Sequence, residues 1–126
     1  MYITVDGKDR RPIYQQIVDE IKGLIATGEL SQGTFLPPVR QVAADLGVNL
    51  NTVAVAYRQL QREGLVKVRH GAGALVISRV LNEPIEEQTR SQLTTALTHL
   101  VLSGLKPSEV RSLVDEELGR LYADAS

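Results

Sequence analysis

The chain has 126 residues, 43% of them hydrophobic and 23% charged, and a formal net charge of -1 at pH 7. This composition is typical of a small soluble globular protein, and the absence of cysteine excludes disulfides, cysteine-ligated metals and thiol catalysis. No apolar run approaches the roughly 18 to 20 residues that span a bilayer and no secretory signal is visible, so we expect a cytoplasmic protein without a membrane partner.

The first predicted helix follows Pro12, a residue that suits the first position of a helix because it lacks an N–H. Gly28 is a natural helix terminator, and the segment "ELSQGTFLPP" that follows is predicted to be a loop. We expect Leu30, Phe35 and Leu36 to pin this loop to the core. The helix itself carries an apolar stripe at helical spacing, formed by Ile13, Ile17, Ile21, Leu24 and Ile25.

Two helices joined by a short turn are predicted next. The first covers residues 38–46 and ends at Gly47; the second begins after Asn49, whose side chain can cap a helix N-terminus, and stops at Gly64. Two helices joined by about three residues that include a glycine are typical of a helix-turn-helix. The inward positions are expected to be Val39, Val42, Ala43 and Leu46 in the first helix and Val53, Tyr57 and Leu60 in the second.

A β-hairpin is predicted in "LVKVRHGAGALVIS". Val66 and Val68 alternate with Lys67 and Arg69, which is the period of a half-buried strand, and the glycines that follow allow a tight reversal into a return strand over residues 75–77. The predicted fold is therefore mainly α with a small β-hairpin: a winged helix-turn-helix domain over residues 1–78.

Residues 79–88 are predicted to be a polar, acidic linker, and residues 89–126 a pair of short amphipathic helices. About 35 residues cannot close a core of their own, so the pair must pack on the same chain or on a second copy. The alternatives are left open, and a dimerisation segment is the preferred interpretation. The apolar positions expected at the interface are Leu93, Leu97, Leu100, Val101, Val110, Leu113, Val114, Leu118 and Leu121.

Several motifs in sequence order resemble the winged-helix domain of GntR-type bacterial transcriptional regulators. They are "PIYQQI", "GEL..G..LPPVRQVA..LGV", "NTV..AY..L..EGL" and "G.G..V". Only about 48 residues follow Ser78, and this short helical tail is similar to that of the YtrA-type branch of the family. The resemblance implies a homodimeric repressor of its own operon and of nearby genes, some encoding transporters, that binds a pseudo-palindromic operator in double-stranded DNA and is released by an unknown small-molecule effector.

The resemblance also implies which residues contact DNA. Arg40 matches the arginine that reaches the major groove, where its fork fits guanine; the alternative is a surface ion pair with Asp45 or Glu63. Asn51 and Thr52, in the first turn of the recognition helix, match polar positions that contact bases or phosphates, although Thr52 can instead bond within its helix. The full set of predicted contacts is Arg40, Leu50, Asn51, Thr52, Arg58, Lys67, Arg69, His70 and Gly71, with Arg62 as a further candidate phosphate contact.

The sequence departs from the family pattern at two places. Pro38 replaces a serine before Arg40, and Leu50 and Ala54 stand where many members carry arginine. The recognition helix "NLNTVAVAY" is thus poor in cations, which leaves a second hypothesis open: a winged-helix protein-interaction module without specific DNA recognition. No phosphate loop, nucleophile motif or metal-ligand spacing is present, so we expect neither an enzyme nor a cofactor.

Overall fold

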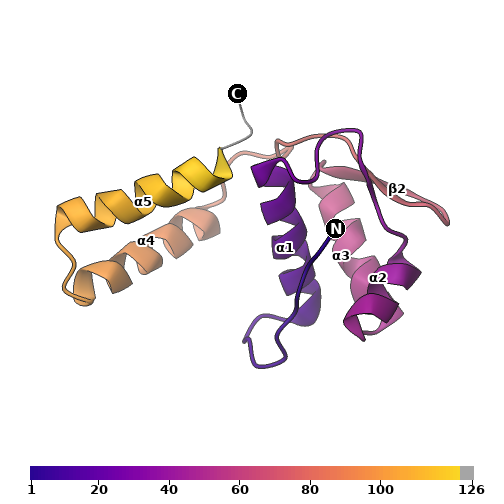
Figure 1. Cartoon of the computed structure of the whole chain (residues 1–126), viewed down its shortest axis with the longest axis horizontal. Helices are drawn as coiled ribbons and strands as arrows, with labels where there is room; N and C mark the ends of the chain where they lie inside the picture. The colour runs from indigo at the N-terminus through magenta and orange to yellow at the C-terminus, as the bar shows by residue number, and fades with distance from the viewer. Residues whose placement is uncertain (123–126) are drawn as a thin grey trace. The chain divides into compact units, whose positions relative to one another are not determined.

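The computed structural model describes residues 1–122, which form two compact units that divide after Asn82. The last four residues of the predicted 89–126 segment lie outside the described residues. Among those described, five helices and one small antiparallel sheet make the chain mainly α (Figure 1). The predicted fold class, a winged helix-turn-helix followed by a helical pair, is confirmed.

Three helices build the core of the first unit. They are α1 (Ile13–Thr27), α2 (Val39–Leu46) and α3 (Leu50–Arg62). The apolar stripe of α1 packs against the inner face of α3, so that Ile17, Ile21, Val53, Tyr57 and Leu60 are at most 1% exposed. The helical periodicity of the sequence therefore predicted the inward faces of both helices correctly.

The turn between α2 and α3 is set by two residues. Gly47 ends α2 in the left-handed conformation with φ 68°, where glycine avoids the strain of a Cβ atom. Two residues later the side-chain oxygen of Asn49 accepts a hydrogen bond from the Asn51 N–H at 2.8 Å, and this is the predicted N-cap of α3. Pro38 precedes α2 and supplies no capping hydrogen bond.

The sheet contains β1 (Phe35–Leu36), β2 (Val66–Arg69) and β3 (Gly73–Val76) in the order β1-β3-β2. The β2–β3 hairpin was predicted, whereas β1 lies in the segment predicted to be a loop. The expectation that Phe35 pins this segment to the core is wrong. In a strand successive side chains point to opposite faces, so Leu36 is 1% exposed and Phe35 is 54% exposed.

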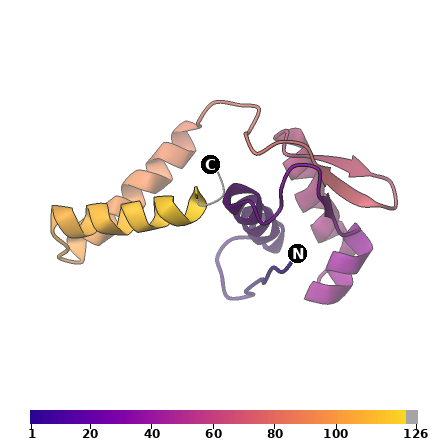
Figure 2. The same cartoon turned by 45° about the horizontal axis from the view of Figure 1, so that its top comes forward.

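Gly73 explains how β1 can lie so close to β3. Its φ of +82° is in the left-handed region, and a Cβ atom at this position would stand 2.0 Å from the carbonyl oxygen of Leu36. A side chain cannot be accommodated there. Gly73 thus serves the approach of the third strand as well as the reversal of the hairpin, whose tip projects away from the helices (Figure 2).

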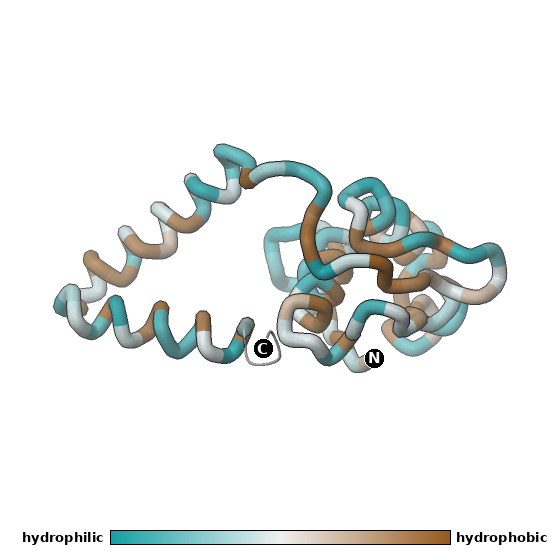
Figure 3. The backbone as a smooth tube through the Cα atoms, turned by 90° about the horizontal axis from the view of Figure 1, so that it is seen from above, coloured by the Kyte–Doolittle hydropathy of each residue, from teal (hydrophilic) through white to brown (hydrophobic). Residues whose placement is uncertain are grey.

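The second unit consists of α4 (Glu87–Leu102) and α5 (Pro107–Leu121), which pack on each other. None of the residues in either helix is buried, and Leu93 and Val101 are 57% and 62% exposed. Figure 3 shows hydrophobic positions recurring along both helices. No helix within residues 1–122 is long and apolar enough to cross a membrane.

Candidate nucleic-acid interface

The first turn of α3 presents the predicted polar and apolar contacts to solvent. Leu50 is 45% exposed, Asn51 is exposed and Thr52 is half-buried. The side chains of Asn51 and Thr52 form no hydrogen bond with any residue from 1 to 122, so the alternative intrahelical bond of Thr52 is absent from the described part of the chain. Both polar groups are therefore available to an external partner.

Arg40 lies in the first turn of α2 and is exposed. The alternative ion pair is not formed: across the described residues Arg40 has no acidic partner, and Glu63 instead binds the Lys22 ammonium at 2.8 Å. All the hydrogen-bond donors of the Arg40 guanidinium are thus available to a ligand.

A hydrogen bond that the sequence did not predict positions Arg40 relative to the recognition helix. The hydroxyl of Tyr57, on the buried side of α3, donates to the carbonyl oxygen of Pro37 at 2.5 Å. Pro37 stands just before α2, so this bond ties the start of α2 to α3. Burial raises the pKa of Tyr57 above its ordinary value, which keeps the donor protonated.

Replacing Tyr57 by phenylalanine is expected to lower the free energy of unfolding by about 1 to 3 kcal/mol, because the Pro37 carbonyl loses its partner. In the wild type the unfolded state releases the tyrosine proton at pH about 10, while the folded state keeps it. The unfolding free energy should therefore fall as the pH rises above 10. Chemical denaturation at pH 7 to 11 checks this, since the part of the decline due to Tyr57 must vanish in the phenylalanine variant.

The hairpin carries its predicted contacts on an exposed surface. Lys67 and Arg69 in β2, and His70 and Gly71 in the turn, are all exposed, and Gly71 adopts a φ of 74°. A second unpredicted bond attaches this hairpin to α3: the Gln61 side-chain oxygen accepts from the Val68 N–H at 2.7 Å. Nothing in the local sequence pattern marks Gln61 for this contact.

Cations dominate this face of the first unit. Both α2 and the hairpin lie on the side of α3 that faces away from α1 (Figures 1 and 2). Five basic residues, one in α2, two in α3 and two in β2, have no ion-pair partner within residues 1–122. Arg11, elsewhere in the unit, instead binds Asp9 and Asp19 and lowers the pKa of Asp9 to about 2 through its hydrogen bonds. The five are Arg40, Arg58, Arg62, Lys67 and Arg69.

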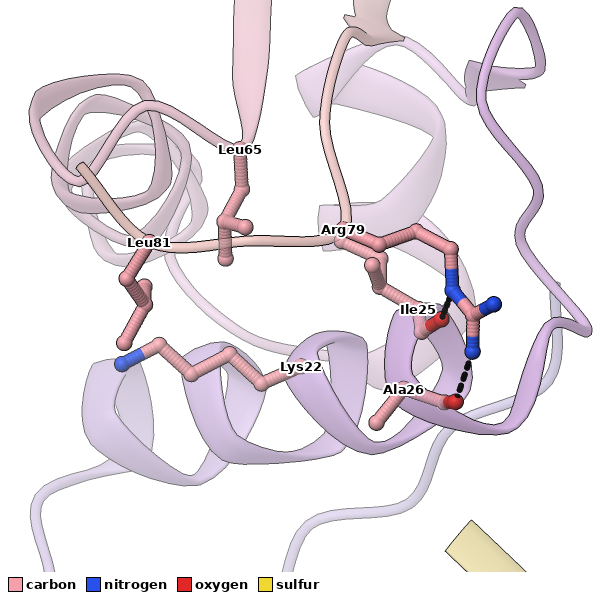
Figure 4. A pocket seen from close by; sticks show the side chains of 6 residues that line it. All are labelled: Lys22, Ile25, Ala26, Leu65, Arg79 and Leu81. Carbon is pink, nitrogen blue, oxygen red and sulfur yellow. Dashed lines mark hydrogen bonds between the residues drawn. The ribbon is translucent and has the colours of Figure 1, made fainter. Parts of the chain in front are cut away.

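A hollow of about 190 Å³ lies away from this face, at the end of α1. Its lining is mostly apolar and includes Ile25, Leu65 and Leu81 (Figure 4). Arg79 stands at its edge and donates hydrogen bonds to the carbonyl oxygens of Ile25 and Ala26. In the described part of the chain, no group of three or more histidine, cysteine or acidic residues could hold a metal ion.

Comparison with known proteins matches residues 13–76 to the family model described as bacterial regulatory proteins, gntR family. The HTH-type transcriptional repressor YtrA of Bacillus subtilis is 38% identical over 74 residues, which cover 59% of this chain and 57% of that protein. The match therefore spans little more than half of the length of that relative.

Solved structures extend the similarity to both units. A structure described as a transcriptional antiterminator from Listeria monocytogenes is 30% identical with a TM-score of 0.77, covering 96% of this chain and 92% of that one. YtrA from Sulfolobus acidocaldarius, described as a GntR-family transcription factor, is 40% identical with a TM-score of 0.61, covering 76% and 97%. The chain is thus similar to transcription factors in sequence and in fold.

Proposed function

Because the chain belongs to the GntR family of bacterial regulatory proteins, we propose that it is a sequence-specific, double-stranded-DNA-binding transcriptional regulator rather than an enzyme. One observation carries the proposal: α2, α3 and β2 carry five basic residues without ion-pair partners in residues 1–122, and the polar first turn of α3 is open to solvent. In the proposed arrangement α3 enters the major groove, as the recognition helix of a helix-turn-helix does, and the hairpin lies beside the minor groove.

We assign base contacts and phosphate contacts to different residues of this interface. Arg40 reads a guanine edge through its bidentate fork, while Asn51 and Thr52 contact an adenine edge or a phosphate. Leu50 offers only apolar contact to a thymine methyl. The cationic contacts to phosphates come from Arg58, Arg62, Lys67 and Arg69, and the turn of the hairpin, His70 and Gly71, lies at the minor groove.

Replacing Leu50 by arginine is expected to strengthen DNA binding and to change its sequence preference, because an exposed apolar side chain at the start of α3 becomes a donor for guanine. Selection of sites from a random duplex pool by the variant and the wild type measures both effects. An identical selected site and an unchanged affinity would show that position 50 does not face DNA.

The proposed assembly is a homodimer that binds a pseudo-palindromic operator. Its support is the second unit, whose helices expose an apolar stripe and bury no residue. The proposed domains are a DNA-binding domain over residues 1–78, a linker over residues 79–88 and a dimerisation segment over residues 89–126; the compact units divide within this linker, after Asn82. Operator symmetry mirrors protein symmetry, so two copies place their recognition helices on matching half-sites.

The proposed regulatory role is repression of its own operon and of nearby genes, some encoding transporters, in the cytoplasm. The similarity to the B. subtilis repressor YtrA supports repression. We further propose that a small-molecule effector releases the protein from its operator. The neighbouring genes are the natural first place to look for the class of effector.

The alternative function, a winged-helix module that binds another protein, is favoured by the absence of lysine and arginine from residues 48–57. The salt dependence of binding to the protein's own promoter fragment separates the two. Six to eight phosphate contacts in a dimer predict that the logarithm of the binding constant falls with the logarithm of salt concentration with a slope of about -5 to -7. A slope near zero would favour the protein-binding module.

A further inference from the structure

The segment that leaves the winged domain is attached to it over several residues beyond the hairpin. We call residues 79–82 the strap. Arg79, its first residue, donates from Nε to the Ile25 carbonyl at 3.2 Å and from Nη2 to the Ala26 carbonyl (Figure 4). These carbonyls belong to the last turn of α1, which has no basic residue of its own. Arg79 therefore supplies a donor to the Ala26 carbonyl, an acceptor that the helix end leaves without an intrahelical partner, and adds a second donor to the Ile25 carbonyl, which also accepts from the Gly28 N–H.

The last residue of the strap binds the end of the recognition helix. The backbone N–H of Asn82 donates to the Glu63 carbonyl at 3.1 Å, and its side-chain amide donates to the Arg62 carbonyl at 3.2 Å. The same side chain lies against Gly64, where an added Cβ atom would stand 3.0 Å from it. Between the two anchors, Leu81 lines the apolar hollow with Leu65. The strap thus holds the C-terminal ends of both α1 and α3.

This attachment determines how much free chain connects the two units. Only residues 83–86 separate Asn82 from Glu87, the first residue of α4, and one of them is Pro84, whose φ is fixed by its ring. Four residues reach at most about 14 Å, whereas the eight residues from 79 to 86 would reach about 28 Å if the strap were released. The strap therefore halves the reach of the connection.

We propose that the strap sets the spacing between the two half-sites of the operator. This inference rests on the proposed function, because it requires two copies joined through α4 and α5. With a short connection, the two winged domains can engage half-sites together only over a narrow range of separations. A longer connection allows a broader range of half-site separations. It also lowers the effective concentration of the second winged domain at its half-site, even at the best separation.

The experiment uses the full-length chain and a series of duplexes. Each duplex carries two copies of the half-site that the wild type selects from a random pool, separated by zero to twelve base pairs. The wild type should prefer one separation. The Arg79→Ala/Asn82→Ala double variant should bind that duplex about threefold more weakly, as expected from doubling the length of the connection, and should discriminate less between separations. Val80→Ala, at an exposed strap position that provides no side-chain anchor, is the matched control and should keep the wild-type preference.

A second variant tests the length argument without touching the strap. Insertion of Gly-Ser-Gly-Ser after Glu83 lengthens the connection and should likewise weaken the preference for one half-site separation. This variant keeps both strap anchors, so it tests the inference even if the double substitution destabilises the fold. Wild-type preference in the insertion variant, or in a folded double variant, would overturn the inference. Failure of the wild type to bind paired half-sites better than one half-site would instead contradict the proposed dimeric function.

Discussion

Replacing Arg40 by alanine is expected to weaken binding to each operator half-site by about fivefold to 150-fold, because a bidentate arginine–guanine contact contributes about 1 to 3 kcal/mol of discrimination. The fold should be unaffected. Arg40 is exposed and has no ion-pair partner in residues 1–122. Its removal therefore leaves no carboxylate of these residues without a counter-ion.

Fluorescence anisotropy with operator and scrambled duplexes measures the effect, and thermal melting verifies the fold. The matched control is Arg10→Ala, which removes an exposed arginine outside the proposed interface and should leave the operator affinity unchanged. Equal losses of affinity for the operator and the scrambled duplex would show that Arg40 contacts only phosphates. An unchanged affinity for both duplexes would show that Arg40 lies outside the interface.

Replacing Leu93 and Val101 together by glutamate is expected to convert the proposed dimer to a monomer. Binding to a two-half-site operator should then weaken by at least about a hundredfold, the advantage that joined binding sites provide. Each side chain is more than half exposed in the single chain, so the substitutions cost the isolated helical pair little. In a dimer interface the same carboxylates would be buried without partners, which is strongly unfavourable.

Analytical ultracentrifugation reports the oligomeric state, and anisotropy with one and two half-sites separates dimerisation from DNA recognition. The double variant should bind a single half-site as well as the wild type does. Thr95→Glu, an exposed position of α4 outside the apolar stripe, is the control and should remain dimeric. A dimeric Leu93→Glu/Val101→Glu protein would place the interface elsewhere.

The parts of the fold that depend on local chemistry could be predicted from the sequence. The apolar period of α1 and α3, the cap at Asn49 and the glycine at Gly47 involve residues close together in the chain, and all three agree with the structure. The hairpin was predicted for the same reason, since its strands are separated by a short turn. Such local structure follows from residue propensity and hydrophobic periodicity, and both can be read from a single sequence.

Contacts between distant residues were not predictable in this way. The strand β1 has two residues, too few to show a period, and its outward Phe35 was therefore assigned to the core. The hydrogen bonds between Tyr57 and Pro37 and between Val68 and Gln61, and the anchors at Arg79 and Asn82, join segments whose proximity only the folded chain reveals. The individual DNA contacts stay predictions.

The most direct measurement is an anisotropy titration of the wild-type protein at moderate salt with its own promoter region and with a scrambled duplex of equal length and composition. A sequence-specific regulator should bind the promoter at least about a thousandfold more tightly than the scrambled DNA. Equal affinity for the two duplexes would contradict the account and would leave the winged domain as a module for another kind of partner.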